Sequence, residues 1–327
     1  MSSRRLLPVA LLGFALITQG QAAEAPPLAL EATIPLPDTR GRIDHLAVDL
    51  VRKKLFIAEL GNGTIDVIDL NSRKVVHRIN GLKEPQGIVY EPKSDLIAVA
   101  SGGDGTLRLY SGKDYAPKGV VNLGDDADNV RGDPRNARLV VGYGSGALAV
   151  IDPAIGKKLR DIPLPAHPES FRLSGSQVFV NAPGAGKIVV ADLDSGKVTA
   201  TWTPEKLSSN FPMILDNSRR VAVVFRSPSR LALFDAATGR QVAVTETCGD
   251  ADDLFFDAKR SRFYVTCGDG SIDVFKAAGN PDRIAQLSTA WGARTSLFVP
   301  ELDRLFLAQR AGLLGSSASL AIYRPAD

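Results

Sequence analysis

Short apolar runs separated by turn residues recur along the whole chain. In the first clear copy of this pattern, the runs are rich in Val, Ile, Leu and Phe and cover residues 45–49, 55–59, 64–69 and 74–79. Runs this short, bounded by turn residues such as Gly61-Asn62-Gly63 and lacking helical periodicity, are typical of β-strands. The pattern therefore predicts a unit of four antiparallel strands.

This unit recurs seven times at a nearly constant period. The second run of each copy aligns at spacings of 41, 43, 39, 43, 42 and 42 residues, counted from Leu55, Leu96, Leu139, Val178, Val221, Phe263 and Leu305. A four-stranded unit of about 40 residues repeated radially is the pattern of a β-propeller. We therefore expect an all-β fold, a seven-bladed β-propeller of four-stranded antiparallel blades that start near residues 44, 85, 128, 169, 210, 252 and 294.

The two ends of the chain are expected to close the ring together. The last copy supplies only three runs, near residues 295–299, 304–308 and 319–323. Residues 30–37, LEATIPLP, resemble the outer strand of the third copy, LRDIPLP at residues 159–165. We predict that the N-terminal strand completes the last blade, which would remove an exposed strand edge that invites aggregation.

One tetrapeptide points to a known family. Residues 264–267, YVTC, differ by one residue from a Tyr-Val-Thr-Asn signature, and residues 55–70, LFIAELGNGTIDVIDL, look like the strand, turn and strand that carry it. The chain thus resembles the YVTN-repeat, YncE-like periplasmic propellers over nearly its whole length. The resemblance implies a seven-bladed propeller in the periplasm, and it implies little about activity, because propellers host many functions.

The first residues have the composition of a signal peptide. Arg4 and Arg5 precede an apolar run over residues 6–17, and small residues follow up to Ala23. The run is short for a membrane span, so we expect residues 1–23 to be cleaved, leaving residues 24–327 as a single propeller domain. A twin-arginine signal and a retained anchor are the alternatives. We expect a periplasmic or secreted protein without a membrane span after cleavage.

The charge of the mature chain is close to neutral. Loss of Arg4 and Arg5 reduces the 39 basic residues to 37, against 36 acidic ones. No run of Lys and Arg marks a surface for nucleic acid, so no nucleic-acid partner is suggested. The partner is expected to be a small molecule or a periplasmic protein, and the chain is taken as a monomer.

Polar residues gather at the predicted starts of the first strands. Ligand sites of propellers usually lie at the mouth of the central channel, which these seven starts would surround. The expected ligand-binding residues are Asp44, Gln86, Asp128, Asn129, Glu169, Asn210, Asp252, Asp253 and Arg294. The set is strongly acidic, and like charges crowded together persist only if they are hydrated, paired, protonated or bound to a cation.

Two interpretations of this acidic mouth remain open. Carboxylate and amide oxygens are the ligands of hard cations, so a divalent ion such as Ca²⁺ would be held by Asp128, Glu169, Asn210 and Asp252. In the other interpretation, the channel is filled with water and the acids are neutralised by Arg42, Arg131, Arg172 and Arg294.

Catalytic motifs are sparse. The chain has three histidines, no G-x-S-x-G motif and no histidine pair with metalloprotease spacing. We therefore expect a binding or interaction protein without catalysis. The alternatives are a metal-assisted lactonase-type hydrolase or a lyase with His45 as general base, or a subunit of a periplasmic redox complex.

The only two cysteines flank the first two strands of the sixth copy. Cys248 precedes the innermost strand and Cys267 ends the strand that pairs with it, so both are expected on the mouth face within bridging reach. We predict a disulfide that braces the loop carrying Asp250, Asp252 and Asp253.

Overall fold

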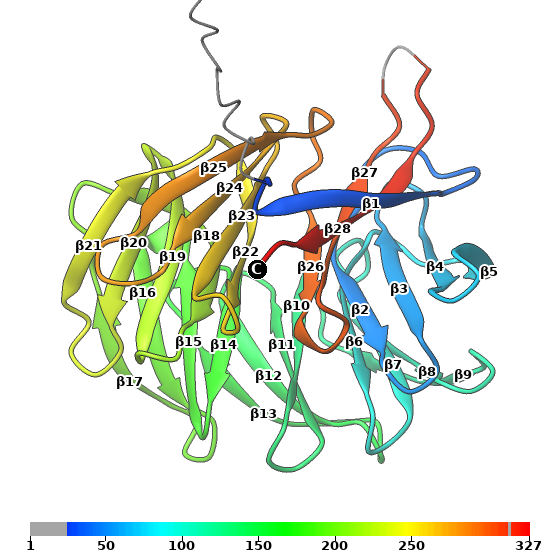
Figure 1. The fold of residues 1–327 in the computed structure, drawn as a ribbon. Coiled ribbons are helices and arrows are strands. Elements are labelled where there is room, and N and C mark those ends of the chain that lie inside the picture. The colour runs from blue at the N-terminus through cyan, green and yellow to red at the C-terminus, as the bar shows by residue number, and fades with distance from the viewer. Residues whose placement is uncertain (1–24, 313–314) are drawn as a thin grey trace, which may run out of the picture.

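A ring of seven sheets builds the protein. The computed structural model describes residues 25–312 and 315–327, and within that part 28 strands form seven four-stranded antiparallel sheets (Figure 1). The predicted seven-bladed propeller is confirmed. The predicted signal peptide, residues 1–23, lies outside the described residues.

The first strand of each blade lies innermost, next to the first strands of its two neighbours. These strands begin within two residues of the predicted starts: β2 (Leu46–Asp49), β6 (Pro85–Glu91), β10 (Ala127–Asp133), β14 (Phe171–Ser174), β18 (Ser208–Leu215), β22 (Ala251–Asp257) and β26 (Ser296–Val299). All seven begin on one face of the ring, the mouth face, and run toward the opposite face.

The second and third strands carry the core. Their side chains are almost all buried because both surfaces of each sheet face a neighbouring blade. The second strands are β3 (Lys54–Glu59), β7 (Leu96–Ser101), β11 (Arg138–Tyr143), β15 (Gln177–Ala182), β19 (Arg220–Ser227), β23 (Arg262–Cys267) and β27 (Arg304–Gln309). The third strands are β4 (Thr64–Asp69), β8 (Thr106–Ser111), β12 (Ala147–Asp152), β16 (Lys187–Asp192), β20 (Ser229–Asp235), β24 (Ser271–Lys276) and β28 (Ser319–Pro325).

The outer strands alternate between buried and exposed positions or are largely exposed. They are β5 (Lys74–Ile79), β9 (Pro117–Asn122), β13 (Lys157–Pro163), β17 (Lys197–Trp202), β21 (Gln241–Glu246), β25 (Asp282–Ser288) and β1 (Leu28–Pro35). β1 lies beside β28, with Leu28 opposite Pro325 and Pro35 opposite Ser319 (Figure 1). The N-terminal strand therefore completes the last blade, as predicted.

Apolar layers between neighbouring blades hold the ring together. Between the first and second blades, Phe56 and Ile65 pack with Ile97 and Tyr110, and a comparable cluster lies at each of the other six blade contacts. The described residues contain two short 3₁₀ turns, η1 (Pro183–Ala185) and η2 (Pro300–Leu302), and no helix in this part is long and apolar enough to cross a membrane.

Candidate functional site at the channel mouth

Four carboxylates line one small cavity at the mouth of the channel. Asp44, Asp128, Glu169 and Asp252 come from the first, third, fourth and sixth blades and share the cavity wall with Arg42, His45, Asn129, Ser170 and Phe211. The cavity holds about 30 Å³. This is room for a water molecule or a small charged group, and it is far less than an organic ligand of drug size needs.

Basic side chains reach three of these acids: Arg42 reaches Asp44, Arg226 and Arg294 reach Asp252, and His167 reaches Asp128. Arg42 Nη2 lies 2.8 Å from Asp44 Oδ2. Asp252 is held by two guanidinium groups, those of Arg226 at 2.5 Å and Arg294 at 2.8 Å. Charge pairing by Arg42 and Arg294 therefore agrees with the second interpretation of the sequence.

Glu169 differs from the other three acids. Within the part of the chain that the structure describes, no Lys, Arg or His nitrogen lies within 4.0 Å of its carboxylate. Burial raises the pKa of Glu169 to about 7, and the charge of Asp128 adds to this effect. The group is thus divided between its acidic and ionised forms near neutral pH.

Asp44 is perturbed in the same direction. Only 3% of the residue is exposed, and burial raises its pKa to about 7 although Arg42 opposes the shift. The charges of Asp128 and Asp252 add to the rise. A cation placed among these acids would relieve this repulsion and favour ionisation of Asp44 and Glu169.

The two histidines of the mouth carry different charges. Asp128, whose Oδ2 lies 3.8 Å from Nε2 of His167, raises the pKa of His167 to about 9 despite partial burial. His167 is therefore protonated at neutral pH, and its Nδ1–H donates to the carbonyl of Gly144 at 2.6 Å. Burial lowers the pKa of His45, so the imidazole of His45 is neutral.

Several predicted site residues lie away from the cavity wall. The side-chain amide of Asn210 donates to Asn181 Oδ1 and to the carbonyl of Lys187, both at 2.9 Å, so Asn210 links the fourth and fifth blades. Gln86 donates to Asp126 Oδ1 at 3.3 Å. Asp253 lies deeper in the channel and accepts the backbone N–H of Ser296 at 2.7 Å.

The two remaining arginines of the second interpretation also lie deeper. Arg131 and Arg172 line the channel below the mouth cavity, whereas Arg226 and His167 take the positions next to the acids. Within the described residues, neither arginine forms an ion pair with a mouth acid, and their charges act on Asp128 and Asp253 from a longer distance. Both guanidinium groups instead bond to neighbouring carbonyl and side-chain oxygens.

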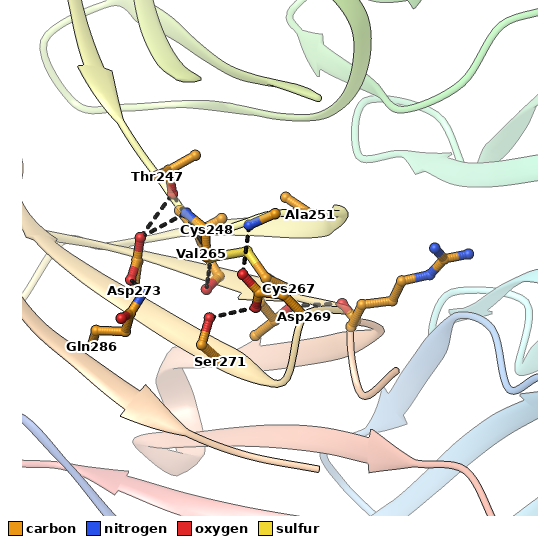
Figure 2. Close-up of a disulfide and its surroundings, with 12 residues drawn as sticks. Thr247, Cys248, Ala251, Val265, Cys267, Asp269, Ser271, Asp273 and Gln286 are labelled. Carbon is orange, nitrogen blue, oxygen red and sulfur yellow. Dashed lines mark hydrogen bonds between the residues drawn. A yellow bond between two sulfur atoms is a disulfide. The ribbon is translucent and has the colours of Figure 1, made fainter. Parts of the chain in front are cut away.

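The predicted disulfide is present. Cys248 and Cys267 are bonded, with their Cα atoms 5.9 Å apart (Figure 2). Two carboxylates hold the same loop. Asp273 Oδ2 accepts the N–H of Cys248 at 2.9 Å (Figure 2). Asp269 Oδ2 accepts the N–H of Gly249 at 2.7 Å. The loop that leads into Asp250 and Asp252 is thus tethered to its own blade.

Arg226 is a residue of the mouth that the pattern at the starts of the first strands does not contain. It lies near the end of a second strand, β19, where the chain again reaches the mouth face. Its guanidinium stacks on the ring of Phe211, 3.8 Å from the centroid. An alignment of the second-strand ends, alongside the first-strand starts, would have exposed it.

The spacing of the acids bears on the metal interpretation. Among the described His, Cys, Asp and Glu residues, one group of three has its ligand atoms within 4.8 Å of one another, and it consists of Cys248, Cys267 and Asp269. Both cysteines are used in the disulfide. Because the oxygens around one Ca²⁺ lie about 2.3–2.6 Å from it, a bare ion would need the mouth acids closer together than they are here.

Comparisons with known proteins identify a fold and no family. No protein-family model and no curated protein matches the sequence. A solved structure described as Kuenenia stuttgartiensis hydrazine synthase is similar, with a TM-score of 0.74 and 14% identity over 84% of this chain and 94% of that chain. At this identity the similarity shows the propeller fold alone.

Proposed function

We propose that this protein is a binding protein whose mouth cavity takes up a positively charged group, most suitably the ammonium group of an amine. The observation that carries the proposal is that Glu169 has no basic partner in the described structure while it shares a small cavity with Asp44, Asp128 and Asp252. One cationic group there would be attracted by four carboxylates, three of which already have basic partners.

Geometry supports an ammonium group over a bare metal ion. An ammonium group donates hydrogen bonds to oxygens at about 2.8 Å and reaches others through water, so it tolerates acids that are spaced more widely. The cavity volume of about 30 Å³ suits such a head group. Phe211 in the wall offers an apolar surface for the first carbons of the ligand.

The test is calorimetric titration of the full chain with methylammonium, butylammonium and N-acetyl-lysine amide, with CaCl₂ as the competing cation. Glu169→Gln should weaken amine binding at least about tenfold, since a charge-assisted contact is lost. Glu205→Gln, which changes an exposed glutamate, should leave it unchanged. Binding of Ca²⁺ without amine binding would return the site to the metal interpretation, and binding of neither cation would refute the proposal.

The pH dependence of the titration gives a second readout. Because the pKa values of Asp44 and Glu169 lie at about 7, binding of a cation should release protons, and amine affinity should rise between pH 6 and pH 8. The rise is at most about tenfold per pH unit for each proton released. A flat profile over this range would contradict the role of these two acids.

The second candidate is a metal-assisted lactonase-type hydrolase or a lyase with His45 as base. It is supported by the neutral imidazole of His45, whose Nε2 lies 3.8 Å from Asp44 Oδ1 in the cavity wall. Turnover of a lactone panel that His45→Gln abolishes, with amine binding retained, would establish it.

We also propose that the protein works in the periplasm or outside the cell and belongs with the YVTN-repeat propellers. The Cys248–Cys267 disulfide supports the compartment, because disulfides persist in oxidising environments. The test is to compare the cell fractions that contain the full chain with those that contain a chain without residues 1–23. Equal retention of both chains in the cytoplasm would contradict the proposed compartment.

A further inference from the structure

A second cavity lies in the central channel, deeper than the mouth cavity. It holds about 250 Å³, is open to solvent and is lined by first strands of six blades. His45 contributes to the walls of both cavities. Most of the wall of this channel cavity is apolar, and the apolar residues of the wall that are partly exposed are Val48, Val89, Phe255 and Leu297.

Two guanidinium groups enter this cavity without a carboxylate partner. Arg131 donates to Asn129 Oδ1 and to the carbonyl of Val130, both at 2.8 Å. Arg172 donates to the carbonyl of Phe171 at 3.0 Å and to Ser170 Oγ at 3.4 Å. Since each guanidinium carries five N–H donors, most of their donors remain free to bind a ligand, and within the described residues neither group has an acid within 4.0 Å.

The charges of the channel cavity leave a surplus of one positive charge. Among the residues that line the cavity, Arg131 and Arg172 face a single carboxylate, that of Asp253, and the imidazole of His45 is neutral. From the mouth, the charge of Asp128 also acts on Arg131. Burial and the nearby charge of Arg131 lower the pKa of Arg172 to about 9. Two like charges thus lie close together in a partly apolar cavity, where an anion between them would be stabilising.

We propose that the channel cavity binds a small organic monoanion with an apolar tail. Its carboxylate would contact the guanidinium groups of Arg131 and Arg172, and its carbon chain would lie along the apolar channel wall. Planar guanidinium groups bind carboxylates through paired hydrogen bonds, and the volume exceeds what an inorganic ion needs. The proposal does not rest on the proposed amine site, although the two cavities share His45.

Calorimetric titration of the wild-type chain with straight-chain carboxylates from butanoate to octanoate tests the proposal directly. Affinity should rise about fourfold for each added CH₂ group that is buried. 1-Octanol and octylammonium, which lack the negative charge, should bind at least about tenfold more weakly than octanoate at the channel. Absence of octanoate binding, or affinity that does not change with chain length, would overturn the proposal.

Variants then locate the head group. The double change Arg131→Met and Arg172→Met, checked for folding by circular dichroism, should weaken octanoate binding at least about tenfold and leave butylammonium binding within about twofold. Arg324→Met, at an exposed arginine, is the matched control. Glu169→Gln should weaken butylammonium binding and leave octanoate binding unchanged, so the proposals for the two sites can be refuted separately. Octanoate binding that is equal in the double variant and the wild type would refute the assignment.

Discussion

The two faces of the propeller arrange their charges in opposite ways. On the opposite face, acids at the ends of first strands pair with arginines that also reach the next blades: Arg52 contacts Asp49 and Asp95, and Arg260 contacts Asp257 and Asp303. The hydrogen bonds from Arg260 lower the pKa of Asp303 to about 2. On the mouth face, burial raises the pKa of Asp44 and of Glu169 to about 7.

The contrast separates stability from binding. Paired charges on the opposite face join neighbouring blades, and the buried acids Asp49 and Asp257 each have a basic partner there. The mouth keeps acids that are poorly compensated, which costs folding free energy and leaves attraction available for a cationic ligand. Changes on the two faces should therefore shift stability in opposite directions.

The largest loss is expected from Arg260→Met. The side chain of Arg260 is 5% exposed, and its loss leaves the carboxylate of Asp257, which is 2% exposed, without its basic partner. Breaking such a pair costs about 3–5 kcal/mol of unfolding free energy. Urea unfolding measures it, with Arg324→Met as control. A loss of unfolding free energy below about 1 kcal/mol would show that this contact does not stabilise the junction between the sixth and seventh blades.

Removal of the disulfide should have the next largest effect. The double change Cys248→Ala and Cys267→Ala opens a loop with a sequence separation of 19 and should cost about 3 kcal/mol. Asp269 and Asp273 still hold the loop, so amine binding at the mouth should fall by less than about tenfold. Wild-type protein reduced with dithiothreitol should lose a similar amount of unfolding free energy. Unchanged urea midpoints together with two titratable thiols in untreated protein would contradict the disulfide.

Glu169→Gln should stabilise the protein, in contrast to the changes on the opposite face. The folded-state pKa of Glu169 is raised from 4.5 to about 7, so its ionisation costs stability progressively as pH rises through this range. The variant should exceed the wild type in unfolding free energy by about 3 kcal/mol at pH 8, and the difference should vanish below pH 4.5. Glu205→Gln is the control. A destabilised variant at pH 8 would mean that Glu169 has a partner that offsets its burial.

The ring could be predicted from the sequence because its information is local and repeated. Each blade carries its own apolar runs and turns, so the same period of about 40 residues can be read seven times. The start of β18 was therefore predicted within two residues, although Asn210 and Phe211 at that position follow no repeat motif. The pairing of β1 with β28 was predictable for the same reason, since LEATIPLP resembles an outer strand elsewhere in the chain.

The charge pairs could not be predicted in the same way because they join different blades. Arg226 reaches Asp252 and Arg260 reaches Asp303, 26 and 43 residues away along the chain. Which arginine contacts which acid depends on side-chain length and on the angle between blades. The spacing of the repeats in the sequence gives no information about either. The sequence identified the acids of the mouth and two of their partners, Arg42 and Arg294, but it did not identify Arg226 or His167.

The smallest predicted effect compares two neighbouring side chains that share one acid. Lys259 Nζ lies 3.4 Å from Asp303 Oδ2, as part of the same contact that Arg260 makes, but the lysine side chain is 62% exposed. Water and salt screen exposed pairs, so Lys259→Met should change the unfolding free energy by less than about 0.5 kcal/mol. Urea unfolding of this variant beside Arg260→Met tests whether burial, rather than the number of charges, sets the strength of the opposite face. Equal losses of unfolding free energy in the two variants would show that burial does not set the strength of these charge pairs.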